Sequence, residues 1–257
     1  MINKFKYKTT KKYKTTATED LFKINEMSPP LLKQTKEEFH TTVTRGLFLS
    51  KRGRPDIQPT IAFLCTRVKE PNEDDWKKLL RLMSYLQVTR DETLTLKADS
   101  ENIVKWWVDA SFAVHPDMRS HTGAVMTLGQ GAIQSILTKQ KVNTRSSTEA
   151  ELVAVDDVMA QILWTKNFLE AQGVPVTDTI LYQDNKSTII LAKNGRASAR
   201  KHMRHLNIRY FFVTDQLERK LLKIEFCPTD EMKGDYMSKP VQGGKFAQFK
   251  KWIMNQQ

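Results

Sequence analysis

Four acidic residues in the second half of the chain have the spacing and surroundings of a site for divalent cations. Asp109, Glu151, Asp184 and Asp235 lie 42, 33 and 51 residues apart. Asp109 and Asp184 each follow a short apolar run typical of a buried strand, and Glu151 lies near the start of a run with helical spacing. Acidic side chains are usually solvated, but strand ends are where open sheets place their sites. Carboxylates gathered there repel one another unless a cation binds between them, so the pattern favours a site for divalent cations.

The type of ligand indicates the type of metal and reaction. Carboxylate oxygens suit Mg²⁺ or Mn²⁺, which are hard cations. Two such ions about 4 Å apart activate a water molecule and stabilise the leaving oxygen in phosphodiester hydrolysis. A zinc pair at His202 and His205 lacks a cysteine or third histidine to complete it. A serine hydrolase based on Ser146 or Ser147 lacks the glycine-flanked nucleophile turn.

The elements that must position these acids follow from hydrophobic periodicity. Ser146 and the polar residues after it predict the N-cap of a long helix that begins near Thr148. Three strands, this helix, and then alternating strands and helices predict an α/β fold, a mixed five-stranded sheet flanked by helices. The expected strands are 106–114, 123–128, 132–139, 180–183 and 222–226, and the expected later helices are 187–193, 205–219 and 246–254.

The first hundred residues have a different pattern. The N-terminal stretch is rich in lysine and threonine, which predicts a solvated arm. Apolar residues at helical spacing then predict a small all-helical segment, whose last helix follows Pro71 and Asn72 and has an acidic first turn. The predicted organisation is an arm over 1–30, a helical segment over 31–100, the α/β domain over 101–242 and a C-terminal helix over 243–257.

Composition restricts the class of partner and the compartment. The net charge is +12 and the pI is about 9.6, which favours a polyanion such as nucleic acid. The chain contains no apolar run of the length that a membrane span requires. Cys65 and Cys227 lie in apolar stretches and are expected to be buried thiols. An intracellular protein, cytoplasmic or nuclear, is expected.

Six segments resemble the ribonuclease H domain of copia-type LTR retrotransposon Pol polyproteins, over residues 104–240. The order and spacing of these segments make the resemblance specific. They are Trp107-Val-Asp-Ala-Ser111, Arg119-Ser-His-Thr-Gly123, Arg145-Ser-Ser-Thr-Glu-Ala-Glu-Leu152, Gln183-Asp-Asn-Lys-Ser187, Lys201-His-Met-Arg-His-Leu-Asn-Ile-Arg-Tyr210 and Asp235-Tyr-Met-Ser-Lys-Pro240.

The resemblance implies an endonuclease that cleaves the RNA strand of an RNA–DNA hybrid with two Mg²⁺ or Mn²⁺ ions. It implies that Asp109, Glu151, Asp184 and Asp235 are the catalytic metal ligands. Glu151 is preferred to Glu149 because the family motif places its acid directly before a leucine or tyrosine. The upstream helices look like the end of the reverse transcriptase that precedes this domain, so the chain resembles a C-terminal fragment of Pol.

Two departures from the family are informative. The polymerase's metal-binding motif is missing, because Val155-Asp156-Asp157 lacks its aromatic residue and lies within the predicted helix, so no polymerase activity is expected. Many ribonucleases H also carry a histidine shortly before the last aspartate. The stretch 227–234 contains none, and Glu231 and Lys233 are the candidates to replace it.

Six further residues are expected to contact nucleic acid. Hydroxyl and amide groups near the acids can bind phosphate or ribose, although helix capping or turn formation explains them equally well, and basic residues can bind phosphates. The residues are Ser111, Thr148, Asn185, Ser187, Arg204 and Arg209.

Two alternatives share this fold. In the first, a relic of a truncated Pol polyprotein binds nucleic acid and does not catalyse. The second is an integrase-like strand-transfer enzyme. In that class the helical glutamate follows two aspartates, whereas here it comes second.

Overall fold

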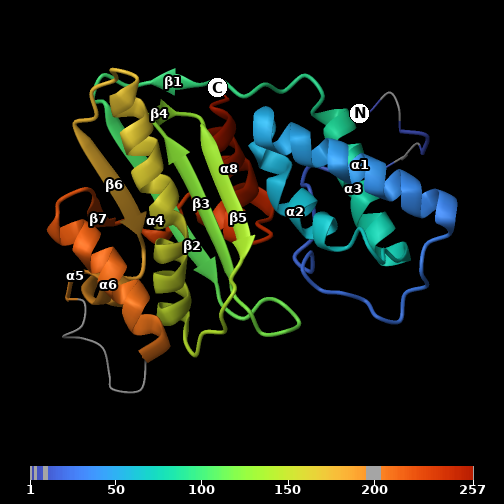
Figure 1. Cartoon of the computed structure of the whole chain (residues 1–257). Coiled ribbons are helices and arrows are strands. Elements are labelled where there is room, and N and C mark those ends of the chain that lie inside the picture. The colour runs from blue at the N-terminus through green and yellow to red at the C-terminus, as the bar shows by residue number, and fades with distance from the viewer. Residues whose placement is uncertain (1, 3–4, 8–10, 195–203, 257) are drawn as a thin grey trace. The chain divides into compact units, whose positions relative to one another are not determined.

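The chain folds into two units, each with its own hydrophobic core. In the computed structural model, one unit comprises Met1–Thr95 with Lys239–Gln257 and the other comprises Leu96–Ser238 (Figure 1). The structure describes residues 2, 5–7, 11–194 and 204–256, without the side chains of residues 204–210. Within these residues, no helix is long and apolar enough to cross a membrane.

The first unit is helical. Its third helix starts with a capping box, in which the side chain of Asn72 accepts from the backbone N–H of Asp75 and the Asp75 side chain accepts from the N–H of Asn72. This satisfies two of the backbone donors that the start of a helix leaves free. The helices are α1 (Lys33–Arg52), the short 3₁₀ helix η2 (Pro55–Ile57), α2 (Gln58–Thr66), α3 (Glu73–Val88) and α8 (Gly243–Met254).

A buried ion pair connects the elements of this unit. Arg54 binds both carboxylate oxygens of Asp56 at 2.8 Å and donates to the backbone carbonyl of Thr89. The Tyr85 hydroxyl donates to the same Asp56 at 2.6 Å. Arg54 is 5% exposed and Asp56 is fully buried, so these hydrogen bonds replace the water that both charges lose.

The structure places the domain boundaries differently from the prediction. The division between units falls after Thr95, and the C-terminal helix belongs to the first unit, where it buries Phe246, Phe249 and Ile253. A backbone hydrogen bond of 3.0 Å from Thr95 to the carbonyl of Met254 joins the two ends of this unit. Apolar burial explains this assignment, because α8 has its own hydrophobic face to cover.

The basic N-terminal stretch is also more ordered than predicted. Leu21 is 1% exposed, and the ring of Phe22 packs 6.0 Å from that of Phe63 on α2. The side chain of Arg81 on α3 donates to the Thr15 hydroxyl. The apolar residues at 17, 21 and 22 therefore anchor a segment whose composition predicted a solvated arm.

The second unit contains the mixed five-stranded sheet that the sequence predicts, so the predicted fold class is confirmed. The strand order is β5-β3-β2-β6-β7; β3 pairs antiparallel with β2 and β5, and β6 pairs parallel with β2 and β7. The strands are β2 (Ile103–Ser111), β3 (His121–Thr127), β5 (Gln134–Lys139), β6 (Asp178–Gln183) and β7 (Lys223–Phe226), and a small separate pair is formed by β1 (Lys97–Ala98) and β4 (Gly129–Gln130).

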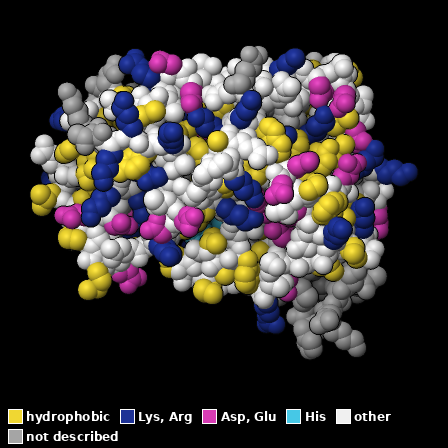
Figure 2. Space-filling view, turned by 180° about the vertical axis from the view of Figure 1, so that it is seen from behind, with side chains coloured by type: hydrophobic (Ala, Val, Ile, Leu, Met, Phe, Trp, Pro, Cys, Tyr) yellow, Lys and Arg dark blue, Asp and Glu magenta, His cyan; other side chains and the backbone are white. Residues whose placement is uncertain are grey.

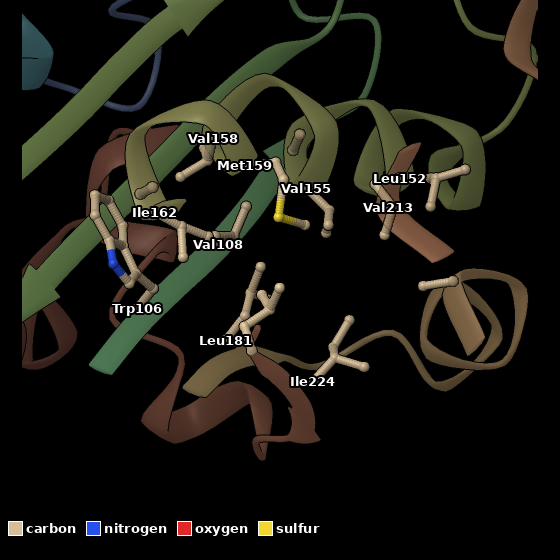
Figure 3. Packing of buried hydrophobic residues seen from close by; sticks show 14 of the residues in the cluster. Trp106, Val108, Leu152, Val155, Val158, Met159, Ile162, Leu181, Val213 and Ile224 are labelled. Carbon is tan, nitrogen blue, oxygen red and sulfur yellow. The ribbon is translucent and has the colours of Figure 1, made fainter. Parts of the chain in front are cut away.

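Helices cover one face of this sheet. They are α4 (Ser147–Ala171), α5 (Lys186–Asn194) and α6 (Arg204–Glu218), and η4 (Thr229–Glu231) and α7 (Asp235–Ser238) follow β7. Val155, Val158, Met159 and Ile162 of α4 face Trp106, Val108 and Leu181 of the sheet in Figure 3. This apolar layer fixes α4 on the sheet, where the helix contacts β2 and β3.

Replacing Arg54 by alanine tests the ion pair of the helical unit. The variant leaves the Asp56 carboxylate buried without its guanidinium partner, and we expect the free energy of unfolding of this unit to fall by about 3–5 kcal/mol. Urea denaturation followed by circular dichroism measures the change. The control is Arg90→Ala, which removes an exposed pair with Asp91 and is expected to change stability by less than about 1 kcal/mol. Equal losses in the two variants would contradict the role given to the buried pair.

Candidate active site

Three of the four predicted acids meet at one edge of the sheet. Asp109 lies near the end of β2, the central strand, and Asp184 follows the last residue of β6. Because β2 and β6 run parallel, both aspartates reach the same edge. Glu151 approaches from the first turns of α4. Ligand oxygens of Asp109, Glu151 and Asp184 all lie within 4.8 Å of one another.

The start of α4 determines which glutamate enters the site. The Ser146 hydroxyl accepts from the backbone N–H of Glu149 and caps the helix, as the sequence predicts. The carboxylate of Glu149 turns back and accepts from the backbone N–H of Arg145 at 2.7 Å. Glu151, two residues later, is 6% exposed and belongs to the acidic group. The two carboxylates therefore have different roles, one in capping and one in the site.

Burial and mutual repulsion dominate the electrostatics. Asp109 is 1% exposed and Asp184 is half-buried. Burial, followed by the charge of Asp109, raises the pKa of the Glu151 carboxyl well above its usual range, and the charge of Asp184 adds to this effect. Hydrogen bonds from the Gln183 side chain and the Ala110 backbone oppose the rise in this pKa. Without a cation, the site therefore favours a proton on Glu151.

Gln183 is a site residue that the sequence analysis missed. Its amide Nε2 donates to Glu151 Oε2 and to the carbonyl of Val108, both at 3.2 Å. Its Oε1 accepts from the backbone N–H of Asn185 at 2.9 Å. This fully buried amide thus connects β6, β2 and α4 directly behind the acids. Its only signal in the sequence is its place before Asp184 at the end of an apolar strand.

Asp235 occupies a different position from the other three acids. It is 2% exposed at the start of α7. Among the described residues, the group whose ligand oxygens lie within 4.8 Å of one another comprises Asp109, Glu151 and Asp184 and does not include Asp235. The backbone before Asp235 nevertheless lies against β2, because a Cβ added to Gly234 would lie 3.0 Å from the Cβ of Asp109.

Two hydroxyl groups hold individual aspartates of the group. The Thr229 hydroxyl donates to Asp184 Oδ2 at 3.0 Å, and the Ser238 hydroxyl donates to Asp109 Oδ2. Sequence reasoning found neither donor, because both come from the segment after β7 and meet their partners only in the folded chain.

The residues expected to contact nucleic acid differ in their exposure and in their hydrogen bonds. The Ser111 hydroxyl donates to the carbonyl of Ser238 at 2.8 Å and is buried. Asn185 Oδ1 accepts from the N–H of Thr188 at 3.1 Å and acts as a helix cap. Thr148 is half-buried, and its carbonyl accepts from the Thr188 hydroxyl. Ser187 is exposed.

Other predicted residues lie outside the described part. They are His202 and the side chains of Arg204, His205 and Arg209.

The stretch 227–234, which contains no histidine, contains a lysine that packs on an aromatic ring. The Lys233 ammonium lies 3.8 Å from the centroid of Trp107, which stacks on Tyr182 at 5.0 Å. Burial lowers the pKa of Lys233 to about 8. A cation held over an aromatic face is stabilised by the ring, so this lysine has a defined place beside β2.

The motif that resembles a polymerase site has a structural explanation here. Val155 is fully buried in the core under α4. Asp157 Oδ2 accepts from the Thr122 hydroxyl of β3 at 3.1 Å. These residues attach α4 to the sheet.

The donor set fits a hard divalent cation. Three carboxylates supply only oxygen ligands, as Mg²⁺ and Mn²⁺ prefer. Two of the three carboxylates, Asp109 and Glu151, are buried, and a cation would relieve both the repulsion among the three and the proton uptake at Glu151.

Comparison with known proteins gives relatives over almost the whole chain. No family model matches. The chain is 27% identical over 251 residues to a retrovirus-related Pol polyprotein from transposon TNT 1-94 of Nicotiana tabacum, covering 96% of this chain and 19% of that protein. It is 29% identical over 198 residues to one from transposon RE1 of Arabidopsis thaliana, covering 76% and 13%. It is 23% identical over 228 residues to the transposon Ty1-DR5 Gag-Pol polyprotein of Saccharomyces cerevisiae, covering 86% and 13%.

Solved structures also align with the chain. A ribonuclease H1 isolated from compost aligns at 13% identity with a TM-score of 0.40, over 53% of this chain and 92% of that one. The ribonuclease H1 of Halobacterium salinarum aligns at 13% identity with a TM-score of 0.35, over 53% and 94%.

The sequence relatives account for most of this chain, whereas this chain spans less than a fifth of the length of each. The chain is therefore homologous to a part of the retrovirus-related Pol polyproteins of copia-type transposons.

Proposed function

We propose that this chain is a retrotransposon ribonuclease H, which hydrolyses the RNA strand of an RNA–DNA hybrid with two Mg²⁺ or Mn²⁺ ions. The observation that carries the proposal is the convergence of Asp109, Glu151 and Asp184 at the edge of the sheet, with their oxygens within 4.8 Å. A buried acidic group of this kind has little structural value by itself, because its charges repel. The homology to Pol polyproteins supports the same reaction.

The chain's own residues have separate roles in this proposal. Asp109 and Asp184 anchor the metal ions, Glu151 binds one of them, and Asp235 completes the site. Gln183 holds Glu151, and Thr229 holds Asp184. The ions, when bound, activate the attacking water and stabilise the leaving oxygen.

Binding of the hybrid relies on basic side chains. The net charge of +12 favours a polyanion, and contacts to phosphates give affinity without reading the sequence. Lys186 and Ser187 follow Asp184 by two and three residues, and both are exposed at the start of α5. We expect them to bind a phosphate beside Asp184. Arg204 and Arg209 remain proposed phosphate ligands.

Cleavage of a labelled RNA–DNA hybrid tests this function. We expect Mg²⁺ or Mn²⁺ to support cutting of the RNA strand and EDTA to abolish it. Asp184→Asn removes a metal ligand, and we expect the rate to fall by at least about 100-fold, the upper end of the effect of losing an outer-shell partner. The matched control is Asp178→Asn, the same change at the other end of β6, where the carboxylate pairs with the exposed Lys223.

The outcomes separate the two candidate functions. Equal cleavage by wild type and Asp184→Asn would contradict the proposed site. Binding of the hybrid that weakens with salt, without cleavage in any metal, would favour a non-catalytic relic.

Replacing Glu151 by glutamine tests the electrostatics of the metal-free site. The folded protein binds the Glu151 proton more tightly than the unfolded chain does, because folding raises this pKa. Stability in EDTA is therefore lost as pH rises from the ordinary carboxyl pKa of about 4.3 to the raised folded value. We expect Glu151→Gln to be more stable than wild type at pH 8, and the difference to vanish near pH 4.

Thermal denaturation in EDTA at the two pH values measures this effect. Glu149→Gln is the control, since it makes the same change two residues earlier in the same helix, in a carboxylate that caps the helix. We expect this control to gain no stability at pH 8. A wild type that is as stable as Glu151→Gln at pH 8 would contradict the raised pKa of the Glu151 carboxyl.

A further inference from the structure

The segment Gly234–Ser238 packs unusually closely on the strand that carries Asp109. The helix α7 contacts β2, β3 and β5. Ser238 is fully buried, and both of its polar ends meet β2: its hydroxyl donates to Asp109 Oδ2, and its carbonyl accepts from the Ser111 hydroxyl at 2.8 Å. One residue is thus joined to β2 on both sides of Ala110.

Two glycines allow this approach. Gly123 pairs with Asp109 across β2 and β3, and a Cβ there would lie 2.6 Å from the backbone nitrogen of Ser238. A Cβ at Gly234 would lie 3.0 Å from both the backbone nitrogen and the Cβ of Asp109. Backbone atoms cannot move aside as a flexible side chain can, so a side chain at either position would displace α7. Close backbone packing at Gly123 and at Gly234 therefore fixes the position of Ser238 beside Asp109.

The Ser238 hydroxyl contacts a carboxylate that is buried in the fold. Asp109 is 1% exposed, and its charge is close enough to Glu151 to raise the pKa of that residue. A hydrogen-bond donor on one oxygen fixes the rotation of the carboxylate. A carboxylate must be oriented toward the cation to bind it.

We propose that Ser238 is a positioning residue for the metal site, which orients the Asp109 carboxylate toward the cation through its hydroxyl. This inference rests on the proposed function, because it assumes that Asp109 binds the metal. It adds a donor from α7, the helix that begins with Asp235, so the segment that supplies the fourth acid also orients the first.

Binding of Mn²⁺ to the protein without nucleic acid, measured by calorimetry, tests the proposal directly. We expect Ser238→Ala to raise the dissociation constant for Mn²⁺ by about 10-fold or more, as for other partners of metal ligands. The control is Ser120→Ala, the same change in an equally buried serine of the same unit, whose hydroxyl contacts Thr144 and the backbone of Ala113. We expect this control to stay within about twofold of wild type.

The dependence of hybrid cleavage on Mn²⁺ concentration gives a second readout that a packing defect would not produce. A positioning role predicts that Ser238→Ala requires about 10-fold more Mn²⁺ for half-maximal rate, while kcat at saturating Mn²⁺ returns close to that of wild type. Melting curves in EDTA establish that the variant is folded. If the alanine variant does not fold, Ser238→Cys replaces it, since it preserves the volume and weakens the donor, and the same direction of change is expected.

The failure of each proposal gives a different result. Unchanged Mn²⁺ affinity in a folded Ser238→Ala or Ser238→Cys variant, with normal binding by wild type, would overturn the role of Ser238 and leave the proposed function intact. Absence of Mn²⁺ binding by wild type, and no effect of Asp184→Asn, would overturn the proposed function itself and the role of Ser238 with it.

Discussion

The repulsion among three carboxylates at the edge of the sheet is the constraint on which the rest of the second unit depends. Asp109 and Glu151 are almost fully buried, and Asp184 completes a group whose oxygens lie within 4.8 Å. Such a group costs stability in the absence of a cation or proton. The fold must therefore hold these residues together by interactions elsewhere. Proteins keep such destabilising groups mainly at functional sites, where the surrounding structure holds them in place. The loss of stability at the end of the central strand therefore indicates a functional site.

The enforcing interactions are of two kinds. On one face of the sheet, the apolar layer of Trp106, Val108 and Leu181 under α4 fixes the helix that carries Glu151. On the other side, the close approach of α7 to Gly123 fixes the helix that begins with Asp235. Hydrophobic burial is not directional, whereas the backbone contact at Gly123 permits one placement. Hydrophobic burial keeps α4 on its face of the sheet, and the contact at Gly123 determines how closely α7 approaches β3.

The surface of the molecule shows why charge alone is a weak guide to the site. Figure 2 shows lysine and arginine side chains distributed over the face that it draws, with acidic side chains between them. A net charge of +12 therefore describes a general attraction for polyanions. Under the proposed function, the specific chemistry comes from a few acids, of which Asp109 and Glu151 are almost fully buried.

The sequence predicts local structure well and tertiary contacts poorly in this chain. Its periodicity predicts the five strands and α4, and the strand predicted over 106–114 extends over Ile103–Ser111. It singles out Asp109, Glu151 and Asp184 because each lies close to a strand end or a helix cap. Gln183 and Ser238 escape prediction, because a polar residue gives no periodic signal and their partners are far away in the chain. The sequence also does not predict that α8 belongs to the first unit. Helical periodicity shows that a helix has an apolar face, but it does not show which hydrophobic core that face covers.

Under the proposed function, metal binding at the acidic site and binding of the hybrid by the basic protein are thermodynamically linked. Phosphates of a hybrid approach a group of carboxylates that repels them, so the site opposes the attraction exerted by the rest of the chain. Bound cations reverse the sign of this local interaction. Metal binding then strengthens hybrid binding, and by reciprocity hybrid binding strengthens metal binding by the same factor. Donors such as Ser238 and Thr229, which orient the carboxylates before the metal arrives, reduce the reorganisation that this coupling requires. The protein's affinity for nucleic acid and its affinity for metal therefore depend on the same few hydrogen bonds.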